Sequence, residues 1–160
     1  MDETVKRYGV AAPEVLKAYD GVGFLKAMIA GTIPQPPMCE LLGFRLIEVE
    51  SGRAVFEGTP GAQHYNPFGV VHGGLAATML DSALGCTVHS TLPQGDGFTT
   101  LELKVNLVRA ISKDTGPLRA EARIVHRGRT VATAEADLKD AAGKLYAHAT
   151  TTCMIFPAQR

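Results

Sequence analysis

The 160-residue chain has no excess of either charge, because 16 Lys and Arg residues balance 16 Asp and Glu residues. Nucleic acids and anionic membranes select proteins with a basic excess, so neither partner is expected. Only three cysteines are present, far apart and without a CxxC pair, which disfavours a disulfide framework and favours a reducing cytoplasm. No long apolar run predicts a membrane span, and the charged start MDETVKRYG lacks the apolar core of a secretory signal.

Several catalytic and ligand-binding motifs are also missing. The chain contains no GxxxxGK[ST] or GxGxxG phosphate loop, no HExxH zinc helix and no GxSxG nucleophile elbow. His64, His72 and Asp81 lack the ligand spacing of a known metal site, and Cys86 has no nearby base that would activate its thiol. We therefore expect no metal and no bound cofactor.

What is present is the composition of an ordinary globular chain, with 46% hydrophobic and 20% charged residues. Apolar residues follow near-helical spacing over residues 13–30, interrupted by Gly21 and Gly23, and the segment ends in the proline-rich stretch 33–37. We assign residues 1–37 to a helical arm and linker, and residues 38–160 to the main domain.

The main domain reads as two strands, one long helix over residues 73–90, and four further strands. The predicted strands cover residues 44–50, 53–59, 101–107, 118–124, 132–138 and 144–156. The later strands alternate apolar and polar residues and are joined by short turns, as in an antiparallel sheet with one wet face. This order predicts an α+β fold in which the sheet covers a single helix.

The predicted helix is apolar on nearly every side, which indicates that it is buried all round. Its one charge is Asp81, the only formally charged residue between Gly58 and Gly95. Burial raises the free energy of an ionised carboxylate unless partners compensate. Asp81 is therefore either a catalytic group or a structural carboxylate that hydrogen-bonds a neighbouring loop.

The loop before the helix reads HYNPFGVVHGG over residues 64–74. Two glycines at a helix start allow a ligand atom to approach free backbone N–H groups at the positive end of the helix dipole. That arrangement suits an oxyanion hole, although a simple chain reversal also uses such glycines. The remaining histidines, His89, His126 and His148, are expected at the surface or at strand edges.

The combined spacing is N-x-x-G-x-x-H-G-G-x(6)-D, formed by Asn66, Gly69, His72-Gly73-Gly74 and Asp81. It resembles the PaaI-type hot-dog acyl-CoA thioesterases, and the resemblance extends over about residues 41–155. It implies a hot-dog fold, with six antiparallel strands wrapped around one helix and the N-terminal helical arm as an extension. It also implies a homodimer with the active site between the subunits, commonly paired again into a tetramer.

The resemblance implies hydrolysis of an acyl-CoA or aryl-CoA thioester to a carboxylic acid and CoA, with no cofactor. Asp81 would be the general base or the nucleophile, and the Gly73 N–H would hold the oxyanion. Asn66 from the facing subunit would polarise the carbonyl or hold water. His72 would orient the loop or the thioester.

A threonine on the strand after the helix would assist the water, with Thr100 nearest that place and Thr99 as the alternative. Arg127 and Arg129 are candidates for the CoA phosphates, although a solvated hairpin explains them equally well. The remaining substrate-binding candidates are Gly74 and His64.

Two other functions are alternatives to hydrolysis. A non-catalytic acyl-CoA sensor would usually carry a DNA-binding domain, for which the neutral, proline-rich 37-residue arm is too short. A hot-dog dehydratase pairs a histidine with an acid in a different loop pattern. Asp81 favours the hydrolase, and an assay of CoA release separates the three.

Overall fold

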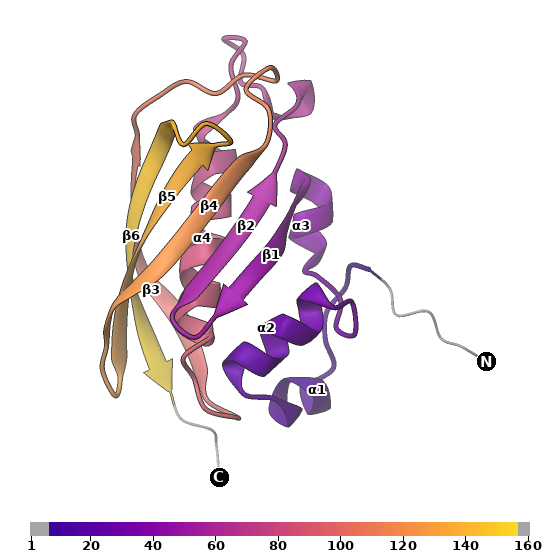
Figure 1. Cartoon of the computed structure of the whole chain (residues 1–160), viewed down its shortest axis with the longest axis vertical. Coiled ribbons are helices and arrows are strands. Elements are labelled where there is room, and N and C mark those ends of the chain that lie inside the picture. Colours follow the sequence, from indigo (N-terminus) through magenta and orange to yellow (C-terminus); the bar gives the residue numbers. More distant parts are fainter. Residues whose placement is uncertain (1–6, 157–160) are drawn as a thin grey trace, which may run out of the picture.

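The structure is a computed structural model that describes residues 7–156, so most of the charged start and residues 157–160 lie outside the described residues. Six antiparallel strands form one sheet in the order β1-β2-β4-β5-β6-β3, and the long helix α4 (Gly73–His89) lies against it (Figure 1). The strands are β1 (Phe44–Glu50), β2 (Arg53–Gly58), β3 (Gly97–Leu107), β4 (Leu118–Arg127), β5 (Val131–Asp140) and β6 (Leu145–Phe156). The other helices are α1 (Pro13–Ala18), α2 (Gly21–Ile29), α3 (Pro37–Leu42) and the 3₁₀ turn η1 (Ala62–His64). The expected α+β fold is confirmed.

Small side chains on the inner face of the sheet let α4 approach closely. The middle strands β4, β5 and β6 direct a layer of buried alanines at the helix, and these strands and β2 all contact it. The layer consists of Ala120, Ala122, Ala132, Ala134, Ala136, Ala147 and Ala149. Close packing of a helix on such a layer buries apolar area without leaving cavities, which is the main stabilising contribution of this core.

The helix α4 is not buried all round, so that part of the sequence prediction is wrong for the described chain. Its buried residues fall on one face, represented by Leu75, Met79 and Leu84. Thr78, Asp81 and Ser82, on another face, remain partly exposed. The reason is geometric, because one sheet covers one side of a helix and leaves the opposite stripe uncovered (Figure 1).

The edge strand β3 contains a bulge that the alternation pattern missed. Its pairing with β6 shifts register between Thr100 and Glu102, which leaves Leu101 as the extra residue. Leu103 packs against the core, whereas Leu101 is 58% exposed, so the predicted alternation of apolar and polar residues does not hold at the start of residues 101–107. A bulge changes which side chains a strand directs inward, and here it lets Thr100 face the same interior as Leu103.

The N-terminal arm forms two short helices and then α3, rather than one interrupted helix. The Asp20 side chain caps α2 by accepting a hydrogen bond from the Gly23 N–H at 2.7 Å. Gly21 lies so close to the end of α4 that a Cβ there would come within 1.7 Å of the His89 carbonyl oxygen. Leu25 and Met28 of α2 belong to the same hydrophobic core as α4.

The two edge strands of the sheet, β1 and β3, have different neighbours. At β1, the buried Gln35 side chain acts like a neighbouring strand: its Oε1 accepts from the Leu46 N–H and its Nε2 donates to the Leu46 carbonyl, both at 3.1 Å. The other edge strand, β3, pairs with β6 on one side and with no other strand within residues 7–156. An open edge of this length is a template for pairing with another chain.

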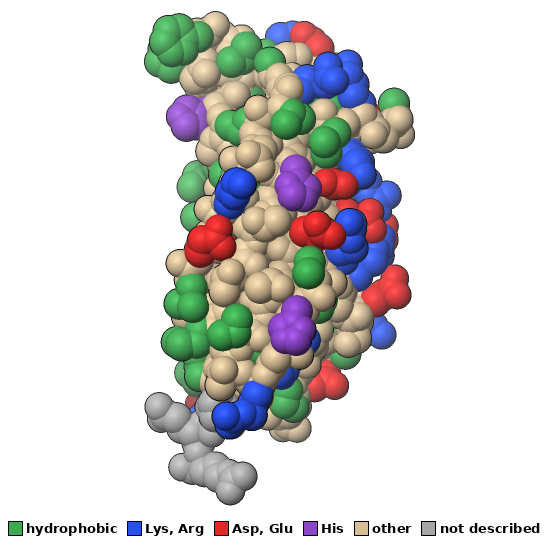
Figure 2. All heavy atoms as spheres, turned by 90° about the vertical axis from the view of Figure 1, so that its left-hand side faces the viewer, with side chains coloured by type: hydrophobic (Ala, Val, Ile, Leu, Met, Phe, Trp, Pro, Cys, Tyr) green, Lys and Arg blue, Asp and Glu red, His purple; other side chains and the backbone are tan. Residues whose placement is uncertain are grey.

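The outer face of the sheet is charged. Arg53 on β2 pairs with Glu48 at 2.9 Å, with Glu50 at 3.2 Å and with Glu121 on β4 at 2.6 Å. Figure 2 shows charged side chains gathered along the margin that carries this face, and hydrophobic side chains along the opposite margin. None of the helices in the described part of the chain is long and apolar enough to cross a membrane.

Candidate active site

Asp81 lies in the middle of α4, half-buried on the stripe that the sheet leaves uncovered. Burial raises the pKa of its carboxyl group above the ordinary 3.8, and a hydrogen bond from the Thr100 side chain partly opposes that rise. A carboxylate that is costly to ionise yet reachable from solvent is a candidate proton acceptor.

The structure separates the two threonines that the sequence left open. Thr100 is opposite Cys153, which is fully buried, whereas Thr99 is opposite the partly exposed Met154. Successive residues of a strand point to opposite faces, so Thr100 shares the inner face with Asp81 and Thr99 does not. The Thr100 hydroxyl also lies 4.0 Å from the Cys153 sulfur.

A cavity of about 240 Å³ opens beside this pair. Asp81, Ser82 and Thr100 form its polar part, and most of the remaining wall is apolar. Two segments that are distant in the sequence meet at this cavity. Met38 and Cys39 of α3 line it together with Phe98 of β3. Periodicity could not reveal this pocket, since its walls come from segments as far apart in the sequence as Pro36 and Thr100.

The start of α4 directs backbone N–H groups outward, as at the N-terminus of any helix. His72 is the N-cap residue: its Nδ1 accepts from the Gly74 N–H at 2.9 Å and its carbonyl from the Leu75 N–H at 3.0 Å. The Gly73 N–H has no acceptor within the helix. The Leu107 side chain lies against Gly73, where a Cβ would come within 2.4 Å of its Cδ1.

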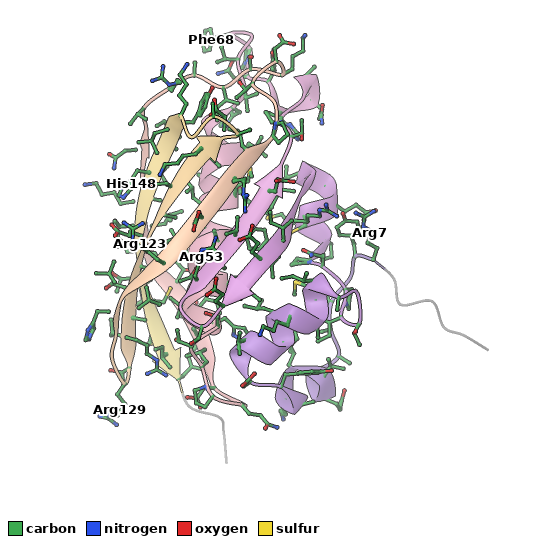
Figure 3. All side chains as sticks on the ribbon, in the orientation of Figure 1. Arg7, Arg53, Phe68, Arg123, Arg129 and His148 are labelled. Atoms are coloured by element: carbon green, nitrogen blue, oxygen red, sulfur yellow. The ribbon has the colours of Figure 1, made fainter. Side chains whose placement is uncertain are left out.

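Asn66 holds its own loop together. Its Oδ1 accepts hydrogen bonds from the Phe68 N–H at 3.0 Å and the Val70 N–H at 3.3 Å. The carbonyl side of the amide is thereby occupied, and the Nδ2 group is the part left to donate. Figure 3 places Phe68 at the tip of this loop, beyond the end of the sheet.

His64 is buried behind the loop. Its Nδ1 accepts from the Gly61 N–H at 2.9 Å, and its backbone carbonyl accepts from the His72 N–H at 2.7 Å. The Nε2 atom is buried and has no hydrogen-bond partner among the described residues. These bonds tie η1 to the N-cap of α4, so His64 positions the helix start.

Arg127 and Arg129 lie far from the loop within one chain. They belong to the β4–β5 hairpin, which Figure 3 shows at the opposite end of the sheet from Phe68. Arg129 is exposed and Arg127 donates to the Gly128 carbonyl. One chain therefore does not bring these arginines to the Gly73 end of α4.

The Gly73 N–H and the Asp81 carboxyl group, the two main groups of the candidate site, lie far apart along α4. Gly73 and Asp81 are eight residues apart, which is about 12 Å along the axis at 1.5 Å per residue. A single carbonyl oxygen cannot accept from the Gly73 N–H while its carbon lies within reach of Asp81 of the same chain.

The prediction that His89 lies at the surface is wrong. Its ring packs between Phe24 of α2, with centroids 5.6 Å apart, and Phe98 of β3, at 5.8 Å. Burial lowers the pKa of this imidazole below its ordinary value, because the charged form is poorly solvated there. Within residues 7–156, no group of three or more His, Cys, Asp or Glu side chains is arranged to hold a metal ion.

A family model described as the thioesterase superfamily matches residues 68–147, half of the chain, from the tip of the loop to β6. The chain belongs to the thioesterase superfamily. Among curated proteins, this thioesterase is 34% identical over 113 residues to a candidate esterase of Saccharolobus solfataricus, covering 69% of this chain and 76% of that one. It is 26% identical to the 1,4-dihydroxy-2-naphthoyl-CoA hydrolase of Listeria monocytogenes, over 66% of this chain and 85% of that protein.

Solved structures agree with this assignment. A candidate thioesterase, described as a phenylacetic acid degradation-related protein, from Ralstonia eutropha is 33% identical, with a TM-score of 0.73, over 81% of this chain and 98% of that one. The PaaI protein of E. coli, 21% identical, has the same fold with a TM-score of 0.69 over 76% of this chain and 86% of that one. The protein is a PaaI-like hot-dog thioesterase, and its general activity is thioester hydrolysis.

Proposed function

We propose that this thioesterase hydrolyses acyl-CoA or aryl-CoA thioesters and that Asp81 is its general base or nucleophile. The observation that carries the proposal is the half-buried Asp81 carboxyl, which lines a largely apolar cavity together with Thr100. A relative that hydrolyses an aromatic CoA thioester supports the substrate class.

In the base mechanism, Asp81 takes a proton from a water molecule that Thr100 helps to hold. The resulting hydroxide attacks the thioester carbonyl carbon, and the oxygen gains a negative charge. Collapse of this tetrahedral species breaks the C–S bond, and CoA leaves as a thiolate that takes up a proton. In the nucleophilic variant, the Asp81 carboxylate attacks the same carbon, the C–S bond breaks and the CoA thiolate leaves and takes up a proton. Water then hydrolyses the mixed anhydride, which releases the carboxylic acid and restores Asp81.

The Gly73 N–H stabilises the oxyanion in either variant, with the positive end of the α4 dipole behind it. Since this group is about 12 Å from Asp81 of the same chain, the two act on one carbonyl only if they come from different chains. We therefore assign each active site to the interface of a homodimer, with β3 as the pairing edge. Exposed Leu101, Leu107 and Val108 along or next to β3 are the apolar residues that such pairing covers.

The other predicted residues have supporting roles in this proposal. Asn66 donates its Nδ2 hydrogens to the carbonyl or to water from the facing subunit, since its Oδ1 is already occupied. His72 and His64 hold the helix start, and Gly74 keeps space beside it.

Pairing of two β3 edges about a twofold axis sets the chains antiparallel. The hairpin end of one sheet then comes alongside the loop end of the other. A contact of Arg127 or Arg129 with the CoA phosphates is therefore possible only across the interface. A dimer of dimers, a cytoplasmic location and the absence of a cofactor are further parts of the proposal.

The test is the release of CoA from a panel of acyl-CoA and aryl-CoA thioesters, followed with a thiol reagent. Asp81→Asn keeps the side-chain volume and removes the base, so the rate should fall by about 10²–10⁴. Asp114→Asn changes an exposed loop carboxylate paired with Lys113 and serves as the matched control. Full activity of Asp81→Asn would overturn the assignment, and binding without turnover by the unchanged protein would favour a non-catalytic acyl-CoA protein.

A further inference from the structure

The cavity beside Asp81 is closed at its far end by one contact between α4 and β3. Gly85 lies one helical turn beyond Asp81, and a Cβ at Gly85 would stand 3.2 Å from the Phe98 ring. The Phe98 side chain therefore rests against the helix where the helix has no side chain. Phe44 and Phe56, almost fully buried, form the wall on the β1–β2 side.

The N-terminal arm holds this end wall in place. Phe98 packs against His89, and His89 packs against Phe24 of α2, with the rings of the second pair inclined at 83°. The end of the arm and the helix α3 that follows it supply part of the side wall, because Pro36, Met38 and the buried Cys39 line the cavity. Met38 is 54% exposed and stands at the rim, where the cavity meets solvent.

The size and lining of the cavity indicate what it holds. An apolar cavity of about 150 Å³ is known to bind a benzene molecule, so 240 Å³ holds one aromatic ring with a short linker, or a short alkyl chain. The only formally charged side chain in the lining is Asp81, beside the Thr100 hydroxyl at the polar end. A thioester carbonyl placed at that end directs its acyl group into the apolar part.

We propose that Phe98 against Gly85, held in place by the N-terminal arm through His89 and Phe24, sets the depth of this cavity and so limits how far an acyl group can extend from Asp81. The inference rests on the proposed hydrolysis at Asp81 and adds the residues that determine its specificity. Long acyl chains are excluded because the Phe98 ring blocks the direction in which they would extend.

The test compares kcat/KM for acetyl-CoA, hexanoyl-CoA, phenylacetyl-CoA and palmitoyl-CoA in three variants. Gly85→Ala shortens the pocket, so phenylacetyl-CoA should lose roughly ten-fold relative to acetyl-CoA. Phe98→Leu lengthens it, so palmitoyl-CoA should gain roughly ten-fold relative to hexanoyl-CoA. Phe156→Leu removes a phenyl ring from the end of β6, outside the cavity, and should leave the profile unchanged. The same profile in all variants would overturn the pocket assignment while leaving hydrolysis intact.

A binding experiment separates the pocket from the chemistry. S-hexyl-CoA and S-dodecyl-CoA are thioethers without a carbonyl, so they bind but cannot be hydrolysed. Calorimetry should show tighter binding of the hexyl compound to the unchanged protein, and a smaller difference in Phe98→Leu. If no thioester is hydrolysed but this pattern holds, the proposed function fails and the pocket stands. Equal affinities for both thioethers in every variant would contradict the proposal that Phe98 and Gly85 limit the length of the acyl group.

Discussion

The two edge strands of the sheet have opposite surroundings. The outer side of β1 is covered by the chain's own N-terminal arm, where Gln35 bonds both backbone groups of Leu46. The outer side of β3 carries exposed Leu101 and Leu107, and no strand within residues 7–156 pairs with it. An unpaired strand edge invites association, so the arm directs association to one edge by covering the other.

This difference matters for catalysis because the groups of the proposed active site lie near β3, the open edge. Thr100 is part of β3, and the Leu107 side chain of β3 lies against Gly73. Closing the β3 edge with a second chain would bury the groups that one chain leaves partly exposed. The covered edge contributes the apolar wall of the cavity instead.

The largest expected effect comes from a substitution that blocks pairing at the open β3 edge. Leu101→Arg places a charge on the exposed bulge of β3, where the two edges would meet, and desolvation of that charge opposes pairing. We expect a monomer by light scattering and a fall in CoA release on the order of 10²-fold, because each site would lose its partner groups. Leu41→Arg is the control: Leu41 is 78% exposed on α3, beside the covered edge. If Leu101→Arg remained a fully active dimer, β3 would not be the pairing edge.

Subunit mixing tests whether two chains share each active site while leaving the β3 edge unchanged. Asn66→Ala and Asp81→Asn chains should each be inactive, and equal amounts should be refolded together so that the chains reassort. Half of the dimers are then mixed, and each holds one intact site, so activity should return to about one quarter of the unmutated value. Mass spectrometry of the intact dimers verifies the exchange. Verified exchange without recovery would mean that Asn66 and Asp81 act within one chain.

At the covered edge, the expected effect is on stability. Gln35→Ala leaves the Leu46 N–H and carbonyl without their buried partner, which should lower the free energy of unfolding by about 1–3 kcal/mol. The measurement is urea denaturation at fixed protein concentration. Gln94→Ala removes an exposed hydrogen bond to the Lys17 carbonyl and should cost at most about 0.5 kcal/mol. Equal losses in the two variants would mean that Gln35 adds nothing special to the β1 edge.

The smallest expected effects concern the ionisation of Asp81, which lies on the side of the open β3 edge. Because burial raises its pKa in the fold, kcat/KM should fall as the pH is lowered through a value above 3.8. The stabilisation that the protonated carboxyl provides is complete below the unfolded pKa and is lost as the pH rises through the folded one. Asp81→Asn should therefore raise the melting temperature at neutral pH, with a smaller difference in acid. Asp114→Asn should show no such trend, and a rate that stays flat down to pH 3.8 would contradict the role of an ionised Asp81.

The local elements could be predicted from the sequence because they depend on local causes. Strand β1 and the start of α4 begin at the predicted residues, since glycine turns and the change from period-two to helical spacing mark them in the chain. Asp81 was found as the lone charge in an apolar helix. The bulge at Leu101 and the ring packing of His89 were missed, because register and neighbours depend on strands and helices distant in the sequence.

The sequence by itself therefore determined the order of elements, the motif from Asn66 to Asp81 and the membership in a thioesterase family. Only the tertiary structure decided which threonine meets Asp81, because the register of β3 on β6 directs Thr100 inward. It also decided that the arm contributes Pro36 to the cavity and Phe24 to the support of Phe98. The physical reason is that spacing along one helix or strand is set by local backbone geometry, whereas a pocket is enclosed by segments that meet only when the core forms.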